Sequence, residues 1–107
     1  MRALIIATVA LGSFASVAQA GVSNLSYLEA ARCRGLAASE NLGKLDTTAL
    51  DAFLRAESPS RDLAVRTSAN NKMQAALKEA NAAEGEKKAK LIAKRDGDCA
   101  AYIAGGQ

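Results

Sequence analysis

Alanine dominates the part of this chain that follows residue 20, and this limits the folds that the chain can form. Residues 21–107 contain 19 alanines but only two tyrosines, one phenylalanine and no tryptophan. Alanine favours helix, yet its side chain buries little area, and burial contributes only about 25 cal/mol per Å². A domain this short with so thin a core is marginal without a covalent crosslink.

Two cysteines offer such a crosslink. Cys33 and Cys99 are the only cysteines in the chain and lie 66 positions apart. The chain-entropy model assigns roughly 4 kcal/mol to closing a loop of that length. Three interpretations are open, namely a bridge within one chain, a bridge between chains, and two reduced thiols in the core. We favour the first, because both cysteines lie on apolar faces of predicted helices.

The first twenty residues favour an oxidising destination. Arg2 precedes an uncharged stretch over residues 3–17, and Ala18-Gln19-Ala20 has the small-x-small pattern that signal peptidase cuts. Residues 1–20 are therefore expected to be a secretory signal peptide that is cleaved after Ala20. The mature protein would then be periplasmic or secreted, where disulfides form and persist.

Local patterns beyond the leader predict helices and no strands. No run alternates apolar and polar residues, and β-branched residues are sparse. A first helix is expected over about 25–42, with a capping box from Ser26 to Glu29 and Gly43 as its stop.

Further breaks divide the rest of the chain. A second helix is expected to begin near Asp46 or Thr48. Ser58 and Pro59 then suit the N-cap and the first position of another helix. Gly85 is the residue at which we expect the remaining stretch to divide into two helices.

Apolar residues recur at helical spacing within these segments. The first face comprises Leu25, Leu28, Cys33, Gly35, Leu36 and Leu42, and the last comprises Leu91, Ile92, Cys99, Tyr102 and Ile103. Leu63, Met73 and Leu77 anchor the segment between them. We therefore predict one all-α domain over residues 21–104, a small helical bundle of three to four helices with one disulfide, followed by a flexible tail over 105–107.

The chemistry of most enzymes is missing from the sequence. The chain has no histidine, which removes Ser-His-Asp and Cys-His catalysis and the usual zinc sites. The nucleotide-binding and nucleophile motifs are also missing. Asp96-Gly97-Asp98 is similar to a calcium loop, but the positions that follow lack oxygen ligands. We expect a protein that is not an enzyme and that has no cofactor and no metal.

Charge excludes two further classes of partner. Without the leader the chain has 13 basic and 11 acidic residues, a net charge of +2 with both signs interspersed. This balance favours neither nucleic acid nor an anionic membrane. No segment after the leader approaches the roughly 20 apolar residues of a membrane-spanning helix, so we expect no stable membrane span after cleavage.

One basic run is a candidate interaction surface, formed by Lys87, Lys88, Lys90, Lys94 and Arg95. The alternative is an ordinary solvent-facing helix whose charge nearby acidic residues balance, and this second interpretation is favoured. Arg95 lies inside the last apolar face, and we expect its long side chain to reach out to solvent.

Three families share partial features with this chain. The segment from Cys99 to Gly105 resembles the C-x-x-Y-I-x-G stretch of Rap/Tai-type periplasmic immunity proteins, which neutralise cell-wall amidases. The layout of a short helical domain with one disulfide is similar to that of HdeA-type acid-stress chaperones. The wide cysteine spacing is similar to that of secretoglobins, whose cysteines pair between chains. None of these resemblances covers enough of the chain to assign a family.

Together these features predict a non-catalytic, exported helical interaction protein. Its partner is expected to be another envelope protein, for which it would act as an inhibitor, an immunity protein or an accessory factor. The alternative is an envelope stress chaperone of the acid-activated type, which exposes its apolar faces when destabilised. With no histidine in the chain, such a trigger would depend on carboxylates and act only well below about pH 5.

Overall fold

The computed structural model describes residues 21–106, and this part of the chain is helical with no strand. Its elements are α2 (Asn24–Ala38), α3 (Thr48–Glu57), the 3₁₀ turn η1 (Ser58–Ser60), α4 (Leu63–Ala82), α5 (Gly85–Asp96) and α6 (Ala100–Ile103). The all-α prediction is confirmed, with four helices of ten residues or more and the single turn α6. The expected signal peptide, residues 1–20, lies outside the described residues. No described helix has the length and apolarity needed to cross a membrane.

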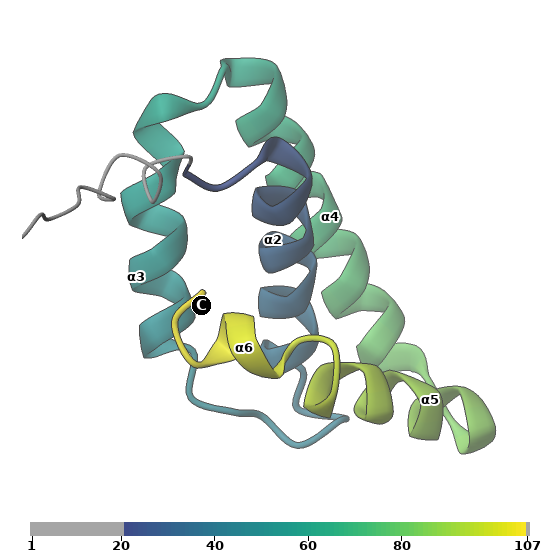
Figure 1. The fold of residues 1–107 in the computed structure, drawn as a ribbon. Coiled ribbons are helices and arrows are strands. Elements are labelled where there is room, and N and C mark those ends of the chain that lie inside the picture. Colours follow the sequence, from purple (N-terminus) through teal and green to yellow (C-terminus); the bar gives the residue numbers. More distant parts are fainter. Residues whose placement is uncertain (1–20, 107) are drawn as a thin grey trace, which may run out of the picture.

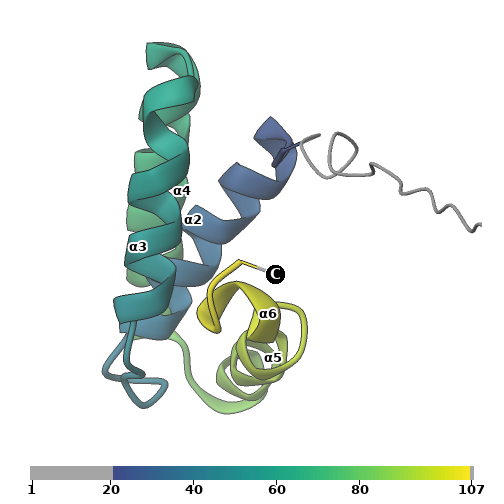
Figure 2. The ribbon, with the colours of Figure 1, turned by 60° about the vertical axis from the view of Figure 1, so that its left-hand side comes forward.

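Helix α2 is the centre of the molecule. α4 packs along it most extensively, and α3, α5 and α6 also contact it. Figure 1 shows α3 and α4 joined at one end through η1 and separating along their length, with α2 against both. In Figure 2, α2 runs obliquely to α3 and α4, and α5 and α6 lie together at the opposite end from η1.

Small residues allow α2 and α4 to approach closely. Gly35 in α2 is buried, and a Cβ atom added there would collide with the backbone carbonyl oxygen of Met73 and lie 2.9 Å from the Cβ of Ala76. Ala76 and Ala80 of α4 are themselves almost fully buried. The alanine-rich sequence therefore builds its core by bringing backbones together, which compensates in part for the small area of each side chain.

The buried residues form two clusters. The larger one surrounds Leu36, Leu50 and the two cysteines, with residues from α5 and α6 packed against it. The smaller one comprises Tyr27, Ala31 and Ala69, close to η1. Most of the predicted apolar faces are buried or half-buried in these clusters.

Two predicted core residues are exposed. Leu25 is 77% exposed and Leu63 is 69% exposed. Each lies in the first turn of its helix, and neither belongs to the two core clusters. The helical periodicity continues to the ends of both helices, but the core does not extend that far.

Several helix ends differ from the prediction. The N-cap of α2 is Ser23, whose Oγ accepts a hydrogen bond from the Ser26 amide at 3.0 Å, so the capping box from Ser26 to Glu29 is wrong. α2 also ends at Ala38, before Gly43, which adopts a positive φ of 96° in the following turn. Ser39 ends the helix instead, and its hydroxyl donates to Asn81 of α4 at 2.7 Å.

The remaining breaks agree better with the sequence. α3 begins at Thr48, and Gly85 separates α4 from α5 as predicted. Ser58 and Pro59 form η1 and do not begin α4, which starts at Leu63.

Candidate functional site

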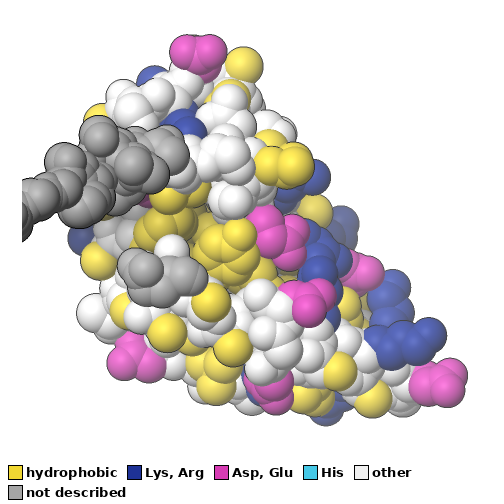
Figure 3. Space-filling view, viewed as in Figure 1, with side chains coloured by type: hydrophobic (Ala, Val, Ile, Leu, Met, Phe, Trp, Pro, Cys, Tyr) yellow, Lys and Arg dark blue, Asp and Glu magenta, His cyan; other side chains and the backbone are white. Residues whose placement is uncertain are grey.

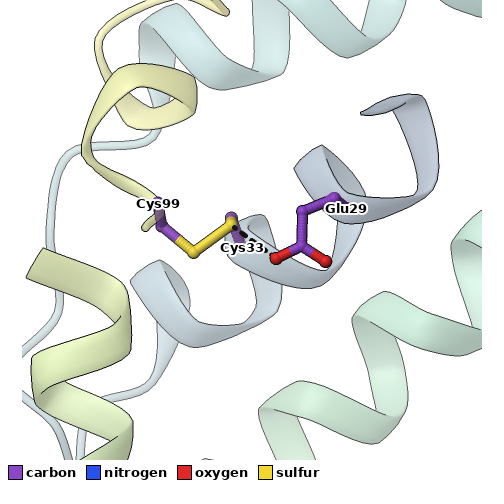
Figure 4. Close-up of side chains that lie close together, drawn as sticks. All are labelled: Glu29, Cys33 and Cys99. Atoms are coloured by element: carbon purple, nitrogen blue, oxygen red, sulfur yellow. Dashed lines mark hydrogen bonds between the residues drawn. A yellow bond between two sulfur atoms is a disulfide. The ribbon is translucent and has the colours of Figure 1, made fainter. Parts of the chain in front are cut away.

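The disulfide is buried and joins α2 to the start of α6 within one chain. Cys33 and Cys99 are bonded with a Cα–Cα distance of 5.5 Å, and both residues are fully buried. Of the three interpretations left open by the sequence, the structure therefore contains the bridge within one chain. Figure 4 shows the bond with the Glu29 side chain beside it.

A small charged group covers the Cys33 side of the bridge. A carboxylate oxygen of Glu29 lies 3.9 Å from the Cys33 sulfur, and the Lys94 ammonium lies 3.4 Å from the same carboxylate and 3.5 Å from that of Asp98. The sulfur atoms of an intact disulfide offer no thiolate to a metal, and Lys94 already neutralises Glu29. This group therefore supports the packing of α5 on α2 and is not a candidate metal site.

The structure does not assemble the predicted basic run into one surface. Lys87 pairs with Glu79 at 3.3 Å, and Lys94 is engaged beside the disulfide. Lys88 and Lys90 make no ion pair among the described residues. Figure 3 shows lysine and arginine side chains interspersed with acidic ones over α4 and α5.

Arg95 faces inward, and the expectation that it reaches solvent is wrong. Its side chain is 8% exposed, and Nη1 donates to the backbone carbonyls of Leu42 and Gly43 at 2.8 and 2.9 Å. Nε donates to Asp96 at 2.9 Å. The loop after α2 has carbonyl groups without helical partners, and a guanidinium with several donors satisfies two of them at once.

Removing this guanidinium is expected to destabilise the fold. Arg95→Ala leaves the two loop carbonyls without their charged donor, so we expect the free energy of unfolding to fall by about 2 kcal/mol. Lys90→Ala, on the exposed side of the same helix, should change it by less than about 0.5 kcal/mol. Urea unfolding followed by circular dichroism measures both, and equal effects would contradict the role given to Arg95.

An apolar groove opens on the described surface. It has a volume of about 750 Å³, is open to solvent, and lies where α2, α3, η1 and α4 meet. Its lining residues are Tyr27, Ala31, Leu54, Arg55, Ser58, Pro59, Arg66, Ala69, Asn70 and Met73. We call this feature the α3–α4 groove.

The charged residues of the groove are both arginines. Arg55 lines it from α3 and Arg66 from α4, and both side chains are exposed. Neither forms an ion pair within the described part of the chain, and the lining contains no acidic residue. The groove therefore combines an apolar surface with two available positive charges.

Polar contacts fix the α3 wall against α2. Arg34 donates to both carboxylate oxygens of Asp51 at 2.8 and 3.3 Å, and the Thr47 hydroxyl donates to the same group at 3.0 Å. The hydrogen bond from Arg34 lowers the pKa of Asp51 below its usual value, and the bond from Thr47 acts in the same direction. The Arg34–Asp51 pair holds the N-terminal half of α3 against α2.

A second contact holds the η1 end of the groove. The Arg61 guanidinium lies over the Tyr27 ring at 5.1 Å and also donates to Asn24 and Glu57 at 3.0 and 2.8 Å. Tyr27 lines the groove from α2, so this contact orients part of the apolar lining.

This site could not be predicted from the sequence. Its lining comes from segments that are separate in the sequence, and no short motif contains more than a few of the residues. No pattern in the sequence indicates that Arg55 and Arg66 line one groove, because only the placement of α3 and α4 brings them together. Comparisons with protein-family models, with characterised proteins and with solved structures find no match to this chain.

Proposed function

We propose that this chain is a non-catalytic, exported interaction protein that binds another protein of the cell envelope. The observation that carries the proposal is the α3–α4 groove, a preformed apolar hollow held between fixed helices. A surface that is already ordered binds with a smaller loss of conformational entropy. The disulfide and the contacts of Asp51 and Arg61 supply that order.

The chemistry of the groove supports binding more than catalysis. Its lining contains no carboxylate, thiol or imidazole, and its polar groups are two guanidiniums, one amide and the hydroxyls of Tyr27 and Ser58. Nucleophilic catalysis by a hydroxyl needs an adjacent base to activate it, and the lining supplies no carboxylate or imidazole for the Ser58 or Tyr27 hydroxyl. Export is supported by the leader pattern together with a buried disulfide, which persists in an oxidising compartment.

A matched pair of groove variants tests this proposal. Asn70 is exposed and lines the groove, whereas Asn71 is equally exposed and does not line it. Asn70→Trp should fill the groove and abolish capture of a partner from an envelope extract of the source organism, while Asn71→Trp should retain it. Both variants should keep the circular dichroism spectrum of the parent. Capture that is unchanged in Asn70→Trp would overturn the assignment of the groove.

A second candidate function is an acid-activated envelope chaperone. The observation that favours it is the Arg34–Asp51 pair, which ties the α3 wall to α2 through a group that titrates in acid. Loss of this pair would free α3 and expose Leu50 and Leu54. No binding of the dye ANS and an unchanged circular dichroism spectrum down to pH 2 would exclude this candidate.

The lowered pKa of Asp51 predicts how its contribution to the stability of the fold changes with pH. A lowered pKa in the folded state stabilises the fold above the ordinary aspartate value of about 3.9 and ceases to do so as the pH falls through the folded value. The melting temperature of Asp51→Asn should therefore lie below that of the parent between pH 5 and 7, and the difference should narrow progressively as the pH falls below about 4. A difference in melting temperature that grows as the pH falls would contradict a lowered pKa for Asp51 in the folded state.

A further inference from the structure

We propose that the occupant of the α3–α4 groove is an amphipathic helix of the partner, with acidic residues flanking its apolar stripe. This inference rests on the proposed function and specifies the chemistry of the partner. It follows from the shape of the groove, from the residues of its lining and from its charge.

The helices around the groove leave a place for one more helix. α3 and α4 each pack against α2 but share few or no close contacts with one another. Because α2 lies against both helices, as the ribbons in Figures 1 and 2 show, we take its lining residues as the floor of the groove and those of α3 and α4 as its walls. A helix laid between the walls would complete a four-helix arrangement, in which each helix buries an apolar face against its neighbours.

The length of the groove fits two turns of a helix. Arg66, Asn70 and Met73 line it at positions i, i+4 and i+7 of α4, which is a span of roughly 10 Å at 1.5 Å per residue. Helix-in-groove recognition uses anchors at this same spacing on the bound helix. The described part of the chain offers no strand edge for an extended peptide to join.

The lining suits apolar anchor side chains. Ala31 and Ala69 are small and leave space above α2, while Leu54 and Met73 supply apolar sides. A leucine or phenylalanine from the partner would fill this space, as buried anchors do in other interfaces. Because the groove is open along its length, it would cover too little of a small amphiphile to retain it, since small-molecule sites bury most of their ligand.

Charge determines which helix fits. Arg55 and Arg66 lie on opposite walls, and neither forms an ion pair within the described residues, although the Arg55 charge is close enough to Asp51 to lower the pKa of that carboxyl. A helix with acidic residues on both sides of its apolar stripe would pair with both arginines. A second copy of this chain fits less well, because the chain without its leader carries a net charge of +2 and like charges repel.

Selection from a peptide display library tests the charge directly. The library presents helical peptides with a fixed leucine stripe, and the positions that flank the stripe vary among glutamate, lysine and glutamine. The oxidised parent protein is the target, and sequences that also bind Asn70→Trp are removed. We expect the retained peptides to be enriched in glutamate at the flanking positions. Enrichment in lysine or glutamine would overturn the inference.

Charge reversal in the protein provides the matched control. Binding of a selected acidic peptide, measured by fluorescence anisotropy, should weaken at least about tenfold in the double variant Arg55→Glu, Arg66→Glu. Lys78→Glu reverses one charge on α4 outside the groove, so it is matched to the single variants Arg55→Glu and Arg66→Glu, and it should leave the affinity unchanged while each of those weakens binding. The lysine version of the peptide should bind the double variant better than it binds the parent. Equal weakening by Lys78→Glu would mean that net charge alone explains the binding.

The outcomes separate the two proposals. If partner capture depends on Asn70 but the selected peptides are not acidic, the proposed function stands and the inference about the occupant fails. If neither capture nor peptide binding depends on Asn70, both fail. A third outcome is that the protein binds sodium palmitate, that Asn70→Trp blocks this binding, and that no peptide is retained. This would assign the groove to a small amphiphile and overturn the inference that a helix occupies it.

Discussion

Replacing both Cys33 and Cys99 with alanine is expected to lower the free energy of unfolding by about 4 kcal/mol, because the crosslink restricts a loop of 66 residues in the unfolded chain. This is a large fraction of the stability available to so small a domain. Alanine is preferred to serine as the replacement, since a hydroxyl at these fully buried positions would add the cost of an unpaired polar group. Urea unfolding at neutral pH measures the difference.

Reduction provides the control for the disulfide variant. The parent in excess dithiothreitol should approach the stability of the double variant, whereas dithiothreitol should not change the double variant. If the double variant were as stable as the oxidised parent, the crosslink would not be what stabilises this core. A single variant is less informative, because it leaves one free thiol that can pair between chains.

Gly35→Ala is expected to destabilise the protein by about 3 kcal/mol, although alanine is the better helix former. The added methyl group would collide with the Met73 carbonyl oxygen and crowd the Ala76 Cβ at 2.9 Å. The carbonyl belongs to the backbone of α4, so it cannot move aside as a side chain could. The helices would have to separate along the most extensive contact of the molecule.

Whether Gly35→Ala lowers or raises the stability shows which of two effects is larger, the steric collision with α4 or the higher helix propensity of alanine. In an exposed helix the same change stabilises by about 1 kcal/mol. Thermal unfolding by circular dichroism should therefore show a lower melting temperature if the close approach of α2 and α4 is real. A higher melting temperature would show that helix propensity dominates and that the two helices are not packed this tightly.

Features governed by neighbouring residues could be predicted from the sequence. Gly85 divides α4 from α5, Thr48 begins α3, and the spacing of Cys33 and Cys99 on apolar faces predicted their pairing. Each of these depends on local backbone preferences or on helical periodicity, which a single sequence contains.

Features governed by distant residues could not be predicted in this way. Periodicity placed Arg95 on an apolar face but gave no sign that the carbonyls of Leu42 and Gly43 would be its partners. Leu25 continues the apolar face of its helix past the point where the core ends. The α3–α4 groove depends on how far two helices stand apart, and that distance is set by their separate contacts with α2.

The placement of the cysteines has a consequence for the order in which the molecule is completed. Synthesis proceeds from the N-terminus, so Cys33 is made 66 residues before its partner. All three helices around the groove, from Asn24 to Ala82, are complete in the chain before Cys99 is made. The bond can therefore close only after the whole groove segment has been synthesised, and the loop that it closes contains α3 and α4. The order that the disulfide gives to the groove is the last to be added.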